Sequence, residues 1–366
     1  KNLGQVDKAL SLALRLQEAC GSSASALNRY NLSKLLGSLY AETRDFRRSI
    51  EFRERALASA KETWIEHLIA AAQGNLGVSL TSAGQLTRGM EFMRMYQDYN
   101  VSAGRMRAEI VSYIHVAQIY FNQGYLDRAE AEYKKGIARA AQRGVSLREA
   151  VCELHYRYGT CLVMAEKYPA ARQHLEQSLA MAREMNNPAS ALYALLNLGF
   201  LFAALGDKAG LTRTVRAIKT GFPGKYKAEV SFAVLEGFRA ISGGRTSAGL
   251  VRIDKALSAM DPQVTAGRFR LFYLCASYLG KSKKLARESE RFLGQAVALA
   301  EKYQMAGWLE KLSPGRRDAG IEPLRLYCLG SLRIEHPVKG PVALDQLQRV
   351  KPFQLLTILA CGALTR

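Results

Sequence analysis

The sequence predicts an all-α protein, a solenoid of helix-turn-helix repeats that is followed by a small α+β segment at the C-terminus. A small residue recurs about every forty positions over the first 312 residues, and a fixed period of this length is typical of a solenoid. Beyond residue 312 the apolar pattern changes to the alternation of strands. The recurring small residues are Gly37, Gly77, Ala117, Gly159, Gly199, Gly237 and Ala276.

Each period contains two helical patterns with a turn between them. In the unit around Ala117, the first helix is expected from Ile110 to Asn122, with apolar residues three and four positions apart on one face. Gly124 interrupts this pattern at a position that suits a left-handed helix cap. A second apolar stripe begins at Leu126. The unit is therefore predicted to be a helical hairpin.

The small residues have a steric explanation. A second small residue follows the first by twelve positions in most units, so both helices of a hairpin carry one. A side chain larger than methyl at either place would push the two helices apart. The second set is Ser49, Gly89, Ala129, Ala171 and Gly249.

This pattern resembles the tetratricopeptide repeat. The unit with Leu36, Gly37, Tyr40 and Ser49 shows the small and aromatic residues in that order. The resemblance implies a right-handed superhelix of about seven to eight repeats over residues 1–312, whose first helices line a concave groove. The common unit has 34 residues, and repeats of about forty resemble those of large bacterial ATP-dependent transcriptional activators such as the maltose regulator.

The tail is predicted to be a second domain, with a linker at 313–322 and a folded segment at 323–366. Alternating strands are expected within Leu324–Glu335, a short strand at Val342–Leu344, and a helix from Lys351 to Leu359. This order resembles the start of an OmpR/PhoB-type winged helix, in the version found in antibiotic-regulatory-protein activators. The alternative is a hairpin and helix that cap the solenoid.

The winged-helix resemblance implies that the helix that reads DNA would follow Arg366. We therefore expect the sequence to be a fragment of a larger regulator, truncated at both ends, which contacts DNA only through a C-terminal domain that is incomplete in this chain. An ATPase module, if the regulator has one, would precede Lys1.

Composition indicates a cytoplasmic protein. The chain opens directly into a repeat with no signal peptide, and its six cysteines form no Cys-x-x-Cys pair, which favours reduced thiols. The longest apolar stretch, from Ala189 to Leu205, keeps the repeat register and is expected to be a buried helix, so no membrane contact is predicted. The net charge of +20 leaves open direct binding of nucleic acid by the solenoid.

No catalytic motif is evident. The P-loop pattern is absent, and the histidines show no metal-ligand spacing. We therefore predict a protein that is not an enzyme and that needs no cofactor or metal.

The groove expected from the resemblance supplies the candidate binding residues. Two positions before the small residue, four successive repeats carry hydrogen-bonding side chains that stacking would bring into a ladder: Asn75, His115, Arg157 and Asn197. Further polar and aromatic residues would surround it: Lys34, Gln118, Tyr156, Tyr193 and Phe200. The alternative is that Asn75 and Asn197 cap local backbone or bridge adjacent helices.

The sequence as a whole therefore favours the signal-sensing or protein-interaction region of a bacterial transcriptional regulator. A protein, a peptide or a small-molecule effector in the concave groove would control an attached DNA-binding domain. The alternative is a repeat scaffold for protein–protein interaction that has no role linked to DNA.

Overall fold

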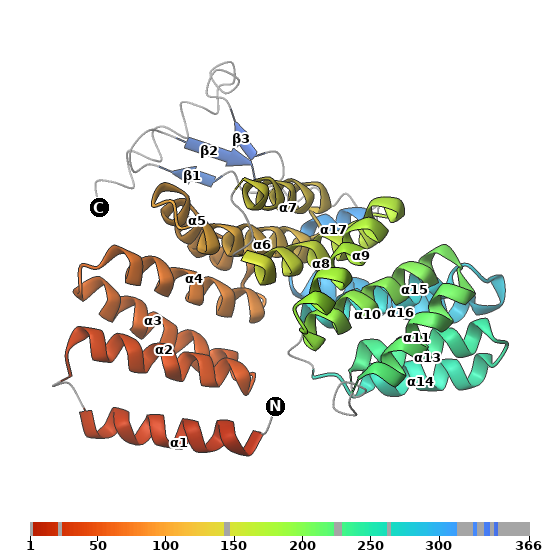
Figure 1. The fold of residues 1–366 in the computed structure, drawn as a ribbon, viewed down its shortest axis with the longest axis horizontal. Helices are drawn as coiled ribbons and strands as arrows, with labels where there is room; N and C mark the ends of the chain where they lie inside the picture. Colours follow the sequence, from red (N-terminus) through yellow and green to blue (C-terminus); the bar gives the residue numbers. More distant parts are fainter. Residues whose placement is uncertain are drawn as a thin grey trace. The chain divides into compact units, whose positions relative to one another are not determined.

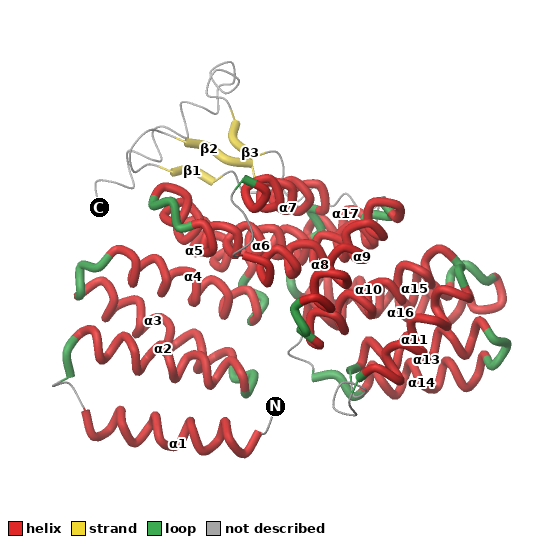
Figure 2. The backbone as a smooth tube through the Cα atoms, viewed as in Figure 1, coloured by secondary structure: helices red, strands yellow, loops and turns green. Residues whose placement is uncertain are grey.

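The computed structural model describes residues 3–20, 24–142, 147–222, 229–261, 265–312, 325–327, 333–336 and 340–342. The chain divides into two compact units, Lys1–Leu312 and Ser313–Arg366. Unit 1 is helical and unit 2 contains the strands (Figures 1 and 2).

The helices of unit 1 follow one another with short turns between most of them. In chain order they are α1 (Leu3–Cys20), α2 (Ala26–Glu42), α3 (Phe46–Glu62), α4 (Glu66–Ser82), α5 (Leu86–Ser102), α6 (Met106–Gln123), α7 (Leu126–Ala141), α8 (Arg148–Met164), α9 (Tyr168–Glu184), α10 (Pro188–Leu205), α11 (Lys208–Gly221), α13 (Val230–Ser242), α14 (Thr246–Ser258), α15 (Thr265–Leu279), the 3-10 turn η3 (Lys283–Leu285), α16 (Ala286–Lys302) and α17 (Ala306–Leu312).

These helices pack as a series of hairpins, so the predicted solenoid is confirmed. Among the described residues the hairpins are α2–α3, α4–α5, α6–α7, α8–α9, α10–α11, α13–α14 and α15–α16, with α1 before them and α17 after them. Residues from Ile110 to Trp308 form one continuous apolar core, and smaller clusters fill the repeats before it.

The small residues lie where the helices of a hairpin touch. A methyl group added to Gly77 would lie 3.1 Å from the carbonyl oxygen of Gly89, and one added to Gly237 would lie 2.9 Å from that of Gly249. In the α2–α3 hairpin, the Ser49 hydroxyl donates to the Gly37 carbonyl at 2.8 Å. The steric explanation of the period is therefore confirmed at these hairpins.

Unit 1 also folds back on itself. The buried indole of Trp308 on α17 donates from Nε1 to the carbonyl oxygen of Phe121, near the end of α6, at 3.0 Å. The Lys311 ammonium donates to the Met164 carbonyl at the end of α8, at 3.2 Å. In Figure 1, α17 accordingly lies beside α6 and α8. Helices far apart in the sequence thus enclose a common interior.

The end of α6 is shaped for this contact. Gly124 caps the helix with φ 93°, in the left-handed region, as the sequence predicts. A methyl group added there would lie 2.5 Å from the carbonyl carbon of Gly307 and closer still to the backbone nitrogen of Trp308. Glycine at 124 therefore serves both the helix cap and the docking of α17.

The most apolar helix of unit 1 lies in its core. Among the described residues, α10 is the one helix long and apolar enough to cross a membrane, and 61% of it is buried in the protein. It packs against α9, α11, α8 and α13. Its apolar side chains therefore serve helix packing, as expected for the stretch from Ala189 to Leu205.

Unit 2 contains a three-stranded antiparallel sheet in the order β1 (Arg325–Tyr327), β2 (Arg333–His336) and β3 (Gly340–Val342). Strands β1 and β2 correspond to the strands expected within 324–335 and cover part of that range. Strand β3 begins at Gly340, two residues before the expected start at Val342, because Gly340 pairs with His336. The expected linker at 313–322 and the expected helix at 351–359 lie outside the described residues.

One buried charge in the first hairpins lacks hydrogen-bond partners for two of its donors. Arg53 on α3 is 7% exposed, and among the described residues its Nε and Nη1 atoms have no hydrogen-bond partner. Because its aliphatic stem packs on Gly37, we expect Arg53→Met to keep that packing, remove the unpaired charge and raise the free energy of unfolding by about 1–2 kcal/mol.

Urea denaturation of both proteins measures this difference. The matched control is Arg55→Met on the same helix, since Arg55 is half exposed and pairs with Glu51. The control should change stability by less than about 0.5 kcal/mol. A loss of stability in Arg53→Met would show that the buried guanidinium stabilises the hairpin.

Candidate functional site

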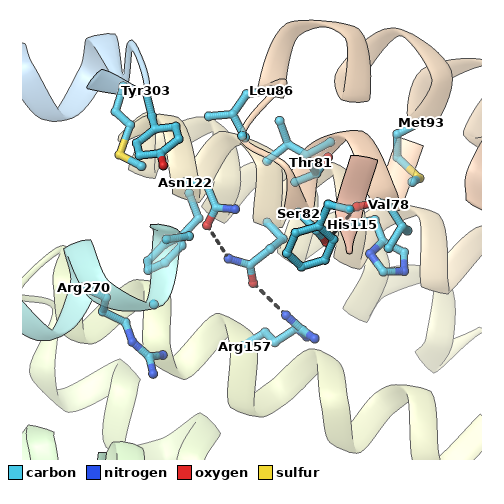
Figure 3. Close-up of a pocket in the computed structure, with 18 residues that line it drawn as sticks. Val78, Thr81, Ser82, Leu86, Met93, His115, Asn122, Arg157, Arg270 and Tyr303 are labelled. Carbon is cyan, nitrogen blue, oxygen red and sulfur yellow. Dashed lines mark hydrogen bonds between the residues drawn. The ribbon is translucent and has the colours of Figure 1, made fainter. Parts of the chain in front are cut away.

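A cavity of about 430 Å³ that is partly open to solvent lies in unit 1. One wall comes mainly from α4, α5, α6 and α8, and the other from α15 and the segment between α16 and α17 (Figure 3). Its size falls within the range of ligand pockets, about 300–1,000 Å³. The lining residues are Phe46, Val78, Thr81, Ser82, Gly84, Leu86, Met93, His115, Gln118, Ile119, Phe121, Asn122, Arg157, Ala266, Gly267, Arg270, Tyr303 and Met305.

A chain of hydrogen bonds runs along the α6–α8 wall. The side-chain amide of Gln118 donates to Asn122 Oδ1 at 2.9 Å, and Arg157 Nη1 donates to Gln118 Oε1 at 2.8 Å (Figure 3). Arg157 Nε donates to Glu153 Oε1 at 2.7 Å. Gln118 on α6 and Glu153 on α8 therefore hold the Arg157 guanidinium in one orientation.

Aromatic rings support the same arginine. The Arg157 guanidinium lies over the Tyr156 ring, 5.4 Å from its centroid, and Tyr156 stacks on Tyr193 of α10 at 5.7 Å. Burial lowers the pKa of Arg157, but Tyr156 and Glu153 together raise it above its ordinary value. The group is thus a fixed positive charge at the cavity wall.

His115 is neutral at physiological pH. Burial, and secondly the nearby charge of Arg157, lower the pKa of His115 to about 4. A neutral imidazole has one donor and one acceptor nitrogen. His115 therefore adds hydrogen-bonding capacity to the cavity without adding charge.

Arg270 faces the cavity from α15 (Figure 3). Its Nε atom is enclosed and has no hydrogen-bond partner in the described part of the chain. Burial, and then the positive charge of Arg157, lower the pKa of Arg270. The cavity thus receives one guanidinium from each wall, and the one on α15 lacks a carboxylate within ion-pair distance among the described residues.

The predicted ladder is only partly assembled at this cavity. His115, Gln118 and Arg157 line it, and Tyr156 and Tyr193 stack beside Arg157. The repeat pattern does not indicate Arg270, Tyr303 or Met305, which also line the cavity. The period marks positions within one repeat, and these residues reach the cavity only because unit 1 folds back on itself.

The other predicted residues lie elsewhere. Asn197 is buried and donates to the Tyr193 carbonyl of its own helix at 2.8 Å, and Phe200 is buried against Phe238. The Lys34 ammonium lies over the Tyr30 ring at 5.2 Å from the centroid. Asn75 is half-buried on α4 and does not line the cavity.

A buried histidine pair lies apart from the cavity. The Nδ1 atoms of His155 and His174 are 2.9 Å apart, and the His174 ring also packs on Tyr158. Burial, together with His174, lowers the pKa of His155 to about 4. Within the described part of the chain, no group of three or more His, Cys, Asp or Glu residues is placed to hold a metal ion.

Solved structures share this fold, although no protein-family profile and no curated protein sequence match the chain. A Rap protein complexed with competence and sporulation factor is 14% identical, with a TM-score of 0.67 over 80% of each chain. The Rap conjugation gene regulator of plasmid pLS20, in complex with the Phr* peptide, is 12% identical, with a TM-score of 0.62 over 78% of this chain and 77% of that one.

A third similar structure is aspartyl phosphate phosphatase F from Bacillus subtilis, which is 14% identical with a TM-score of 0.61 over 78% of this chain and 73% of that chain. The solenoid has a TPR-like fold. At these identities the similarity establishes the fold of the TPR-like unit, and the cavity described above belongs to that unit.

Proposed function

We propose that the TPR-like unit binds a peptide effector in its interior cavity and that binding regulates the activity of an attached domain. The observation that carries this proposal is the cavity itself, whose walls come from helices distant in the sequence. The structure of the pLS20 regulator with the Phr* peptide supports a peptide as the effector.

The lining suits a short extended peptide. The side-chain oxygens of Gln118 and Asn122 already accept hydrogen bonds within the protein, and their amide nitrogens can donate to the carbonyl groups of a peptide backbone. Val78, Ile119 and Met93 offer apolar contact for side chains. Ligand sites commonly combine such an apolar lining with a few fixed polar groups.

Regulation would follow from the closure of the TPR-like unit. An effector that contacts both α6 and α15 binds the closed arrangement more tightly than an open one and therefore favours it. Helix α17, which completes the closed arrangement, ends at Leu312, directly before unit 2. The preference for the closed arrangement would thus affect the end of α17, which directly precedes the first residue of unit 2.

We further propose that the attached domain is a DNA-binding domain of a bacterial transcriptional regulator. The antiparallel order of β1, β2 and β3 supports this proposal, since three strands precede the first helix in the winged-helix resemblance. The alternative is a scaffold without a role linked to DNA. Salt-dependent binding of DNA by the full-length protein would favour the transcriptional regulator, and the absence of such binding would favour the scaffold.

The role proposed for this chain is binding rather than catalysis, in the cytoplasm. The described cysteines Cys152, Cys161 and Cys275 are buried and free, as expected in a reducing compartment. Because a solved neighbour is a phosphatase, hydrolysis of aspartyl phosphate is a second activity to assay. Turnover by the purified chain would contradict a role in binding alone.

A fluorescence-polarisation screen of labelled heptapeptides tests the proposed function. We expect binders, and we expect Gln118→Met to weaken them about 3- to 10-fold because it removes hydrogen-bonding groups from the cavity. Gln73→Met on α4 is the matched control, since Gln73 contacts Met95 outside the cavity. A screen without binders, or equal loss in both variants, would contradict the proposal.

A further inference from the structure

We infer that the effector carries a carboxylate, which the guanidinium groups of Arg157 and Arg270 bind from opposite walls of the cavity. This inference rests on the proposed function and specifies the chemistry of its ligand. It assigns recognition of the effector's charge to Arg270, a residue outside the predicted ladder.

The charges at the cavity are not balanced by the described residues. Arg157 has a carboxylate partner, Glu153, at 2.7 Å. Arg270 forms no ion pair within 4 Å with any described residue, although Glu229 on the approach to α13 is near enough to affect its pKa. Two guanidinium groups therefore line the cavity, and only one of them, that of Arg157, is ion-paired with a described carboxylate.

This arrangement has an energetic cost. Arg270 is half-buried, and a cation that is partly removed from water without an ion-pair partner is unfavourable because its lost hydration is not fully replaced. The enclosed Nε of Arg270 has no hydrogen-bond partner, and the positive charge of Arg157 adds repulsion. An anionic group in the cavity would give the Arg270 guanidinium an ion-pair partner, which none of the described residues supplies, and would offset that repulsion.

The lining favours a carboxylate on a carbon chain over a free inorganic anion. A guanidinium presents parallel donors that match the two oxygens of a carboxylate. The remaining lining includes Val78, Met93 and Ile119, which give no hydrogen bonds but suit aliphatic atoms. We therefore commit to an aspartate, a glutamate or a C-terminal carboxylate of a peptide.

The experiment uses the whole chain and paired peptide libraries. Each acidic heptapeptide is matched with an uncharged partner in which Asp is replaced by Asn, Glu by Gln and the C-terminal carboxylate by an amide. Affinities are measured by fluorescence polarisation at fixed ionic strength for the native protein, Arg270→Met and Arg268→Met. Inorganic phosphate is added as a competitor in a separate arm.

Arg268→Met is the matched control on the same helix. Arg268 also has an enclosed Nε without a partner, and its guanidinium lies 5.7 Å from the centroid of the Phe272 ring, but it does not line the cavity. Thermal melting of each variant establishes that it is folded. Because the unpaired charge is removed, Arg270→Met should melt no lower than the native protein.

We expect the acidic peptides to bind at least about 10-fold more tightly than their uncharged partners, and Arg270→Met to lose about 10- to 100-fold in affinity while Arg268→Met retains it. Equal binding of paired peptides would overturn the carboxylate inference and leave the proposed function intact. Binding of phosphate without any acidic peptide would also overturn it. If no peptide of either library binds, the proposed function itself fails.

Should Arg270→Met fail to fold, Arg270→Lys decides the question. A lysine keeps the charge but lacks the parallel donors, so we expect a partial loss of affinity for acidic peptides and none for uncharged ones. An unchanged preference for acidic peptides in Arg270→Lys, together with loss in Arg268→Met, would assign the charge recognition to a different residue.

Discussion

Gly124→Ala should destabilise the protein by at least about 3 kcal/mol. The left-handed backbone at Gly124, with φ 93°, costs a residue with a side chain about 1–2 kcal/mol. The added methyl group would also overlap the backbone of Gly307 and Trp308. Helix α17 would have to move, and loss of a buried tryptophan contact costs about 3–5 kcal/mol when it is complete.

Urea denaturation followed by circular dichroism measures this effect, and Gly206→Ala is the matched control. Gly206 caps α10 with φ 72°, but a methyl group there would meet nothing within 4 Å. The control should lose only about 1–2 kcal/mol. Equal losses in the two variants would show that the contact between α6 and α17 contributes nothing to stability.

The second large effect is a loss of stability in acid. His155 is 4% exposed, and its pKa is about 4 in the folded protein against an ordinary value of 6.5. The unfolded chain therefore binds more protons than the folded chain between these two pH values. The stabilisation is complete above pH 6.5 and falls by about 2–3 kcal/mol as the pH is lowered to 4.

Burial of the pair sets the sign of this effect. The Nδ1 atoms of His155 and His174 are 2.9 Å apart, and Tyr158 packs on the His174 ring. Burial lowers the pKa of His174, Glu130 raises it, and Lys134 lowers it. Two protonated imidazoles at this distance would repel each other. His115, whose pKa is also about 4, adds to the loss over the same pH range.

The free energy of unfolding of His155→Gln between pH 7 and 4 tests this origin. Glutamine retains hydrogen-bonding capacity toward His174 but does not titrate. Its pH dependence should be shallower than that of the native protein, whereas substitution of the exposed His67 by glutamine should leave the profile unchanged. A profile as steep in His155→Gln as in the native protein would contradict the assignment.

The repeat could be predicted because it depends on contacts between neighbours. The close approach of Gly77 to Gly89 and the cap at Gly124 are local requirements that leave a periodic pattern in the sequence. The contact between Trp308 and Phe121 spans 187 positions and leaves no such pattern. The closure of unit 1 was therefore not predictable from the period.

The same distinction explains the site. His115 and Arg157 occupy equivalent positions in successive repeats, and the structure places both at the cavity. Asn197 has the same position, but its amide binds the backbone of its own helix. Arg270 reaches the cavity only through closure, so no spacing within a repeat indicates it.

Hydrogen–deuterium exchange on the chain, with and without the tightest acidic heptapeptide of the screen, tests the central claim most directly. If the effector lies between the two walls, exchange should slow in both 115–122 on α6 and 266–270 on α15, which line the cavity. Protection confined to one of these segments, or to helices that do not line the cavity, would contradict the account.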